Sequence, residues 1–234
     1  MTEHAVVSHE EWLAARKALL AEEKDFTQRR DELSRRRREL PWEPVTDEYV
    51  FAGENGPEAL VDLFGRQSQL VVYHFMYPAD WEAGCPSCSF WADSFDPNVV
   101  HLAARDIRLV AVSKAPPEKL LAYRERMGWT FHWVSSFDND FNRDFGVGFE
   151  PDEEDAPVYN YGGNVPGMAE REGVSVFVKV AAGAVFHTYS AYARGIDVLN
   201  AAYSYIDLTP RGRDEVGQGT FPQFWVRRHD EYDR

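Results

Sequence analysis

The chain of 234 residues contains only two cysteines, so a network of disulfides cannot hold it together. The two stand three positions apart, where a bridge would close a very small loop and add little stability. No apolar run approaches the roughly 18 residues of a membrane-spanning helix. Residues 1–11 are polar and acidic, without the apolar core of a signal peptide. From these absences we expect a soluble, cytoplasmic protein without a membrane partner, whose thiols are kept reduced.

Basic residues are also scarce: 25 Lys and Arg stand against 39 Asp and Glu, for a net charge of −14. General nucleic-acid binding needs a basic surface, so we expect no nucleic-acid partner. The one basic run, residues 35–38, is flanked by Glu32 and Glu39 in a helical stretch and is typical of a solvated helix face.

The two cysteines stand where a predicted strand meets a predicted helix. Residues 70–77 (LVVYHFMY) form an apolar run typical of a buried strand, and residues 89–104 can continue as a helix. Free backbone N–H groups and the helix dipole stabilise a thiolate at a helix N-terminus, and only the thiolate attacks. The motif Cys85-Pro86-Ser87-Cys88 therefore predicts thiol redox chemistry, with Cys85 as nucleophile and the more buried Cys88 as resolving thiol. Two structural cysteines at an accidental spacing are the alternative, and no cofactor is expected.

Aromatic and acidic residues near the cysteines complete the predicted site. Tyr77, Trp81 and Trp91 are predicted to form a substrate-binding surface, with ordinary core packing as the alternative. Glu82 is predicted to shuttle a proton during exchange. A zinc or copper site made of the two thiols with His74 and His187 is a further alternative. The chain has no second C-x-x-C and no H-x-x-x-H, so no metal ligand is predicted.

The order of elements predicts an α/β fold. A capping box, Ser8-x-x-Glu11, opens a helix over 9–39, in which an apolar stripe one residue wide recurs every seven positions. The stripe is expected to contact its own domain or a second subunit. Alternating strands and helices then predict parallel strands with crossover helices, followed by an antiparallel hairpin. The expected strands are 49–51, 70–77, 107–112, 131–134, 174–180 and 184–189, and the expected helices are 57–64, 89–104, 117–127, 138–145 and 195–206.

These elements divide the chain into three predicted parts. Residues 1–45 form a helical arm, residues 46–210 form the domain with an insertion loop over 147–172, and residues 211–234 form a tail. The long helix and the segment around Trp225 suggest arms that reach a second subunit, so a homodimer is expected.

Strand, cysteine helix, strand, helix, hairpin and helix is also the thioredoxin order, and residues 49–207 resemble a thioredoxin-like fold with a central mixed sheet and flanking helices. Residues 75–86 (FMYPADWEAGCP) resemble the peroxiredoxin stretch Y-P-x-D-F-T-x-x-C-P, whose cysteine attacks peroxide. Nearly the whole chain resembles the thioredoxin-like domain-of-unknown-function family eight-nine-nine. The segments that carry this resemblance are YHFMYPADWEAGCPSCSFWAD, RLVAVSKAP, RMGWTFHWVSSFDNDFNRDFGV, VFHTYSAYARG and WVRRHDEYD.

The sequence departs from both better-known patterns. Glu82 stands where peroxiredoxins keep a threonine, and residues 173–175 (GVS) stand where thioredoxins keep a cis-proline. Peroxiredoxins also place an arginine near the thiolate; Arg124 and Arg126 are expected to be solvated, and no arginine is assigned to that role.

Together these features predict a dithiol–disulfide oxidoreductase that acts on a thiol, disulfide or peroxide substrate and is reset by an external reductant. A thiol peroxidase using the same cysteines is one alternative. A non-catalytic binding module, with or without copper or zinc, is the other.

Overall fold

The computed structural model describes residues 4–149, 158–162, 168–217 and 222–232. The chain divides into two compact units, residues 1–41 and residues 42–234. None of the helices in the described part of the chain is both long enough and apolar enough to cross a membrane.

The first unit is a single long helix, α1 (His9–Arg37). The predicted capping box is confirmed: Ser8 Oγ accepts from the Glu11 N–H at 3.3 Å, and the Glu11 carboxylate accepts from the Ser8 N–H at 2.9 Å. None of the helix residues is buried. The apolar stripe is exposed throughout, and its members are Trp12, Leu19, Phe26, Leu33 and Leu40.

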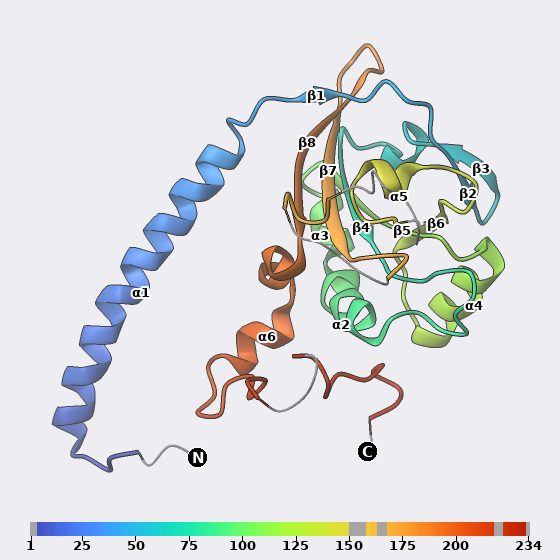
Figure 1. Ribbon diagram of the computed structural model, residues 1–234. Coiled ribbons are helices and arrows are strands. Elements are labelled where there is room, and N and C mark those ends of the chain that lie inside the picture. Colours follow the sequence, from blue (N-terminus) through green and yellow to red (C-terminus); the bar gives the residue numbers. More distant parts are fainter. Residues whose placement is uncertain (1–3, 150–157, 163–167, 218–221, 233–234) are drawn as a thin grey trace. The chain divides into compact units, whose positions relative to one another are not determined.

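The second unit is built on an eight-stranded mixed sheet with the order β1-β8-β7-β4-β5-β6-β2-β3 (Figure 1). Strand β4 is parallel to β5, and β5 is parallel to β6, whereas β7 is antiparallel to both β4 and β8. The strands are β1 (Glu43–Pro44), β2 (Val50–Gly53), β3 (Gly56–Ala59), β4 (Gln69–His74), β5 (Ile107–Ser113), β6 (His132–Ser135), β7 (Gly173–Lys179) and β8 (Val185–Tyr192). The helices are α2 (Pro86–Phe95), α3 (Val99–Ala103), α4 (Pro117–Met127), α5 (Phe141–Asp144) and α6 (Ala201–Ile206), with 3₁₀ helices at Asp62–Phe64, Asp96–Asn98 and Ala193–Leu199.

Alternation along the central strands separates two apolar layers. Leu70 and Val72 of β4 pack with the 3₁₀ helix Asp62–Phe64 and with Phe141 of α5. Tyr73, one position on, belongs to the layer on the other face, together with buried residues of α2 and α4. The cysteine helix α2 therefore lies over one face of the sheet, at the end of β4. The predicted thioredoxin-like fold, a central mixed sheet with flanking helices and a long N-terminal helix, is confirmed.

Three predicted helices differ from the structure. Residues 56–59 form strand β3, because Glu54 and Asn55 make a two-residue turn that pairs Gly53 with Gly56, whose φ is +119°. The predicted helix 89–104 breaks into α2 and α3 around Pro97, which has no N–H to donate to the helix. The predicted helix 195–206 divides at Asn200, whose side chain accepts from Tyr203 N and caps α6.

The segments that flank the sheet carry further differences. Within the predicted insertion loop 147–172, Gly148 and Glu170 form an isolated antiparallel bridge, and much of the rest lies outside the described residues.

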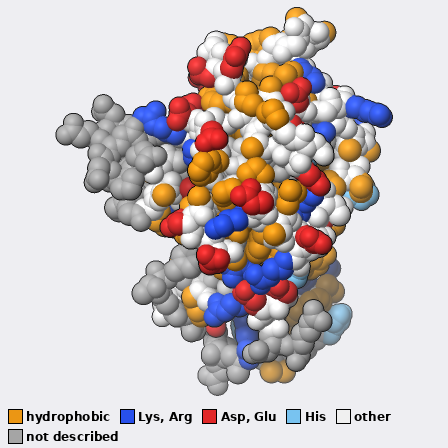
Figure 2. Space-filling model, turned by 90° about the vertical axis from the view of Figure 1, so that its right-hand side faces the viewer, with side chains coloured by type: hydrophobic (Ala, Val, Ile, Leu, Met, Phe, Trp, Pro, Cys, Tyr) orange, Lys and Arg blue, Asp and Glu red, His pale blue; other side chains and the backbone are white. Residues whose placement is uncertain are grey.

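On the face seen in Figure 2, acidic, basic and apolar side chains are interspersed, so the net negative charge is not gathered there into one acidic patch.

Candidate functional site

Cys85 occupies the N-cap position of helix α2, with Pro86 at the first helical position. Proline is well suited there because its missing N–H would have no helical partner. The Cys85 N–H donates to the Met76 carbonyl at 3.1 Å, so the residue is tied to the chain that follows β4. Both cysteines are free thiols; Cys85 is half-buried, and Cys88 is buried.

The two thiols differ in their electrostatic surroundings. A hydrogen bond from Cys88, helped by the backbone N–H groups of Cys88 and Ser87, lowers the pKa of Cys85, although burial opposes the shift. Burial and the bond to Cys85 raise the pKa of Cys88 well above its ordinary value. Cys85 is thus the thiol that ionises first, and Cys88 is the proton donor to it.

Two buried groups surround Cys88. The Met76 N–H donates to its sulfur at 3.4 Å. The hydroxyl of Tyr73 has no hydrogen-bond partner of normal geometry in the described part of the chain. Burial, and after it the charge of Cys88, raises the pKa of Tyr73. Cys88 therefore sits in a largely apolar environment that favours its neutral form.

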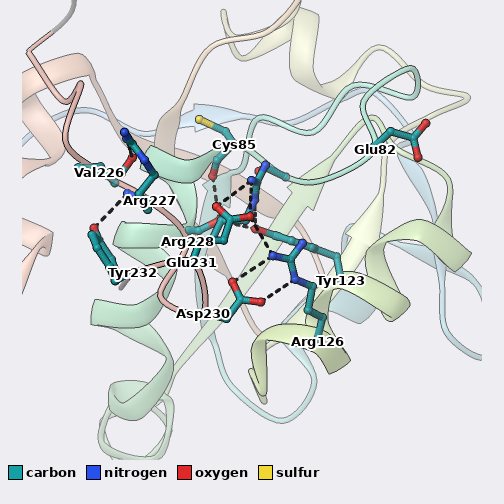
Figure 3. Close-up of polar contacts among 12 residues, drawn as sticks. Glu82, Cys85, Tyr123, Arg126, Val226, Arg227, Arg228, Asp230, Glu231 and Tyr232 are labelled. Atoms are coloured by element: carbon teal, nitrogen blue, oxygen red, sulfur yellow. Dashed lines mark hydrogen bonds and ion pairs between the residues drawn. The ribbon is translucent and has the colours of Figure 1, made fainter. Parts of the chain in front are cut away.

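The negative charge that changes the pKa values of the two thiols comes from Glu172 and not from Glu82, the carboxylate chosen from the sequence. The side chain of Glu82 points away from Cys85 (Figure 3). Glu172, immediately before β7, instead contributes a negative charge that partly opposes the lowering of the Cys85 pKa and adds to the raised pKa of Cys88. Tyr159 holds it by donating its hydroxyl to Glu172 Oε1 at 3.1 Å. Nothing in the sequence connected residues 85 and 172, because sheet pairing alone brings them together.

The three predicted substrate-binding aromatics separate in the structure. Trp81 and Trp91 line the same cavity as the cysteines, and Trp91 donates its indole N–H to the Ile196 carbonyl at 2.9 Å. Tyr77 is buried; its hydroxyl donates to the Glu82 carbonyl, and its ring packs against Tyr123. The structure therefore brings the two tryptophans to the cysteines, whereas Tyr77 is packed between the cysteine loop and α4.

The cavity has a volume of about 1190 Å³ and is lined by residues of α2, of the segment before β7, of the 3₁₀ helix Ala193–Leu199 and of the C-terminal tail. Its apolar wall includes Met76, Trp81, Trp91, Met168, Ile196 and Phe224. Charged groups of both signs also line it, and Arg213 among them is already paired with Asp197 and Asp207. A cavity of this size and lining accommodates a small organic molecule beside Cys85.

The C-terminal tail reaches the cysteine loop, a contact that the sequence did not predict. Arg228 donates to the Gly84 carbonyl from Nε at 3.1 Å and from Nη2 at 2.8 Å (Figure 3). Val226, two positions earlier, is buried and lines the cavity. Trp225 donates to Glu215 and packs on Phe90 of α2, so its indole is engaged within this chain. The only signal for this contact was the terminal segment WVRRHDEYD, which carried the family resemblance but no structural role.

The histidines of the metal alternative belong to another network. His74 Nε2 lies 2.9 Å from Ser175 Oγ, and Ser175 is in turn bonded to Ser190. His187 Nε2 lies 2.8 Å from the same Ser190 hydroxyl. Two serines thus stand between these imidazoles, and no group of three or more His, Cys, Asp or Glu side chains suited to a metal occurs among the described residues.

The sheet and the position of its cysteine helix define a thioredoxin-like protein that carries a C-x-x-C at the N-terminus of that helix. Over residues 1–232 the chain matches the family described as "Bacterial protein of unknown function (DUF899)", and it belongs to that family. None of the curated proteins compared with the chain matches it.

Several solved structures are similar to this one. Peroxiredoxin Q of Xanthomonas campestris has a TM-score of 0.49 and 12% identity, with 71% of this chain and 95% of that chain covered. Peroxidoxin BcpB of Mycobacterium tuberculosis has a TM-score of 0.47 and 17% identity, with coverages of 71% and 97%. A putative thiol:disulfide interchange protein DsbE of Chlorobium tepidum has a TM-score of 0.41 and 16% identity, with coverages of 71% and 94%. These identities are low and the TM-scores lie below 0.5, so the likeness says nothing about the chemistry of this chain.

Proposed function

We propose that the protein is a dithiol–disulfide oxidoreductase in which Cys85 attacks and Cys88 resolves. The observation that carries the proposal is the inequality of the two thiols. Cys85 is half-buried at the N-cap of α2 with a lowered pKa, whereas Cys88 is buried with a raised pKa. A nucleophile must be ionised and reachable, and a resolving thiol must wait nearby in its protonated form.

The reaction balances with these two residues and an external dithiol. The Cys85 thiolate attacks one sulfur of a substrate disulfide, and the other sulfur leaves as a thiolate. Cys88 then loses its proton and attacks Cys85, which releases the reduced substrate and closes the 85–88 disulfide. An external dithiol reduces that disulfide and restores both thiols. Because the charge of Cys85 is one cause of the raised Cys88 pKa, formation of the mixed disulfide makes Cys88 easier to ionise.

The cavity favours a second candidate, a thiol peroxidase that uses the same residues. An organic hydroperoxide fits a cavity of about 1190 Å³ with an apolar wall. The Cys85 thiolate would attack the terminal peroxide oxygen, the O–O bond would break, the alkoxide would leave and take a proton from water to become an alcohol, and Cys85 would become a sulfenic acid. The Cys88 thiol would condense with it, release water and form the same 85–88 disulfide.

The location and assembly of the protein remain proposals of the same kind. We place it in the cytoplasm, where thiol reductants are available to reset the pair. We also propose a homodimer, for which the exposed stripe of α1 offers an apolar surface.

The experiment that tests the function is a redox titration of the full chain and of two variants. Mild oxidation with diamide should convert the wild type into the 85–88 disulfide, seen as a loss of two free thiols and of two mass units in the peptide spanning both cysteines. Cys88→Ser should accumulate a mixed disulfide with a small disulfide substrate, and Cys85→Ser should form none.

A peroxide arm separates the two candidates. Cumene hydroperoxide added to Cys88→Ser should yield a dimedone-trapped sulfenic acid at Cys85 only if the peroxidase holds. Failure of the wild type to form an 85–88 disulfide with either oxidant would overturn both candidates.

A further inference from the structure

Arg228 of the C-terminal tail hydrogen-bonds to the backbone beside Cys85. Its guanidinium makes two bonds to the Gly84 carbonyl, and Nε also donates to the Tyr123 hydroxyl at 3.0 Å. Bonds from a charged donor are roughly twice as strong as neutral ones. The side chain is only 17% exposed, so water competes weakly for these bonds.

The peptide between Gly84 and Cys85 is therefore held at both ends. Its carbonyl accepts from Arg228, and its N–H donates to the Met76 carbonyl. Gly84 itself is confined, because a Cβ there would lie 2.7 Å from the rings of Phe75 and Tyr123. This peptide has little freedom to rotate while Arg228 remains bound.

The peptide after Cys85 is fixed through the same tyrosine. The Cys85 carbonyl accepts from Ser89 N at 2.9 Å and from Ser89 Oγ at 2.8 Å. Ser89 Oγ also lies 2.8 Å from the Tyr123 hydroxyl, to which Arg228 donates. One connected network thus contacts the carbonyls on both sides of the thiol.

Arg228 is in turn anchored to helix α4 (Figure 3). Its Nη1 donates to the Glu231 carboxylate at 2.9 Å and 3.2 Å, and Glu231 also accepts from Arg126 at 3.0 Å. Asp230 adds a bidentate pair with Arg126 at 2.7 Å and 3.0 Å. The tail is therefore docked by a network of charges, which is more rigid than an isolated surface pair.

We propose that Arg228 is a positioning residue for Cys85: by holding the Gly84 carbonyl and Tyr123, it keeps the thiol at the N-terminus of α2, where the helix dipole and the free N–H groups of the first turn stabilise a thiolate. The proposal deepens the proposed function and rests on it for its biological meaning. Hydrogen bonds to a thiolate depend steeply on distance and angle, so a small displacement of Cys85 weakens them. The reactivity of Cys85 is then linked to the docking of the tail, more than 140 residues away in the sequence.

The test is the pH dependence of Cys85 alkylation by iodoacetamide in the full-length reduced protein, with the modified residue identified by peptide mass. Arg228→Met keeps the apolar stem and removes the guanidinium. It should raise the midpoint of the alkylation profile by roughly half a pH unit or more, which is a roughly threefold lower thiolate fraction below the midpoint. The matched control is Arg227→Met, because the guanidinium of Arg227 donates to carbonyls of the tail itself, those of Phe224 and Val226. It loses the same charge from the neighbouring position and should leave the profile unchanged.

Two outcomes overturn the proposal: an unshifted profile in Arg228→Met, or an equal shift in Arg227→Met. If Arg228→Met does not fold, Tyr123→Phe removes the hydroxyl on which Arg228 and Ser89 meet, and it should shift the midpoint in the same direction; an unshifted profile there also overturns the proposal. Alkylation needs neither a substrate nor an 85–88 disulfide. A shifted profile in a protein that never forms that disulfide would therefore reject the proposed function and retain the positioning role.

Discussion

Helix α1 and the Cys85 site are held by opposite kinds of contact. The hydrogen bonds that join the side chains of α1, from the Ser8 cap to the pairs of Arg35, connect residues three to seven positions apart. Beside its local bonds, the site has bonds that connect residues 93, 105 and 144 positions apart: Tyr77 with Glu170, Trp91 with Ile196, and Gly84 with Arg228. A terminal segment can therefore contribute to the site without forming a helix or a strand. The described tail has no helix or strand, yet it supplies part of the cavity wall.

The difference also sets how each region responds to change. Most of the stability of a helix in a folded protein comes from packing an apolar face, and α1 buries none of its residues. A substitution in α1 should therefore change the stability of only the helical turns around it. A substitution in the tail should act on several distant segments at once.

The largest expected effect on stability comes from introducing an aspartate into the tail, and the same substitution in α1 is its control. Val226→Asp puts a carboxylate at a position that is 3% exposed, beside the cavity that also holds Glu215. Burial of an unpaired charge should lower the free energy of unfolding by about 3 kcal/mol or more, or undock the tail. Leu20→Asp, at a position in α1 that is 38% exposed and lies outside the apolar stripe, should cost less than about 1 kcal/mol. Urea unfolding, together with limited proteolysis of the tail, measures both; equal effects would contradict the contrast between the regions.

A second prediction concerns pH and the buried carboxyl of Glu170. Glu170 accepts from the Tyr77 N–H at 3.0 Å and from Asn142 Nδ2 at 3.2 Å, and burial raises its pKa to about 7 against the opposing effect of those bonds and of Lys114. Between its ordinary value of 4.5 and about 7, the folded protein holds a proton that the unfolded chain releases. Its contribution to stability is therefore full below pH 4.5 and falls as the pH rises through 7, by about 3 kcal/mol in all.

Glu170→Gln isolates this contribution from other titrations. The buried His74, whose pKa burial lowers to about 3, adds stability as the pH rises to its ordinary value of 6.5 and so opposes the trend in the wild type. The amide of a glutamine at 170 still accepts from Tyr77, and it can donate to Asn142 Oδ1, which has no partner among the described residues. The difference in unfolding free energy between variant and wild type should grow from pH 4.5 to 7. Parallel profiles would show that Glu170 is ionised in the folded state throughout.

Much of the fold was predictable because it rests on local patterns. The capping box of α1, the apolar run of β4 and the glycine that ends α4 are each written within a few residues, and each is present in the structure. The errors also have local causes. The turn at Glu54-Asn55 was overlooked in favour of a helix beginning at Pro57, and Pro97 divided a helix that apolar spacing alone would continue.

The site was predictable only where its residues are close in sequence. The cysteines and the two tryptophans that line the cavity lie within eleven positions of one another, from Trp81 to Trp91. Glu172 lies just before β7 and Arg228 lies in the tail, and no pattern in one sequence states which distant segments will meet. Glu82 shows the converse: it is near Cys85 along the chain, but its side chain points away from Cys85 in the structure.

The smallest expected effect tests whether α1 is as self-contained as its contacts indicate. Ser8→Ala removes the oxygen that accepts from the Glu11 N–H, and the loss of such a cap costs about 1 kcal/mol. Because the side-chain contacts of the cap all join Ser8 and Glu11, amide exchange should accelerate in the first turn of α1 and nowhere in residues 42–232. Thr27→Ala is the matched control: its hydroxyl bonds to the Glu23 carbonyl within the helix, and alanine is the better helix former, so exchange there should slow slightly. If Ser8→Ala also changed the alkylation rate of Cys85, the first turn of α1 would be coupled to the site, and the division between local and long-range contacts would no longer describe this molecule.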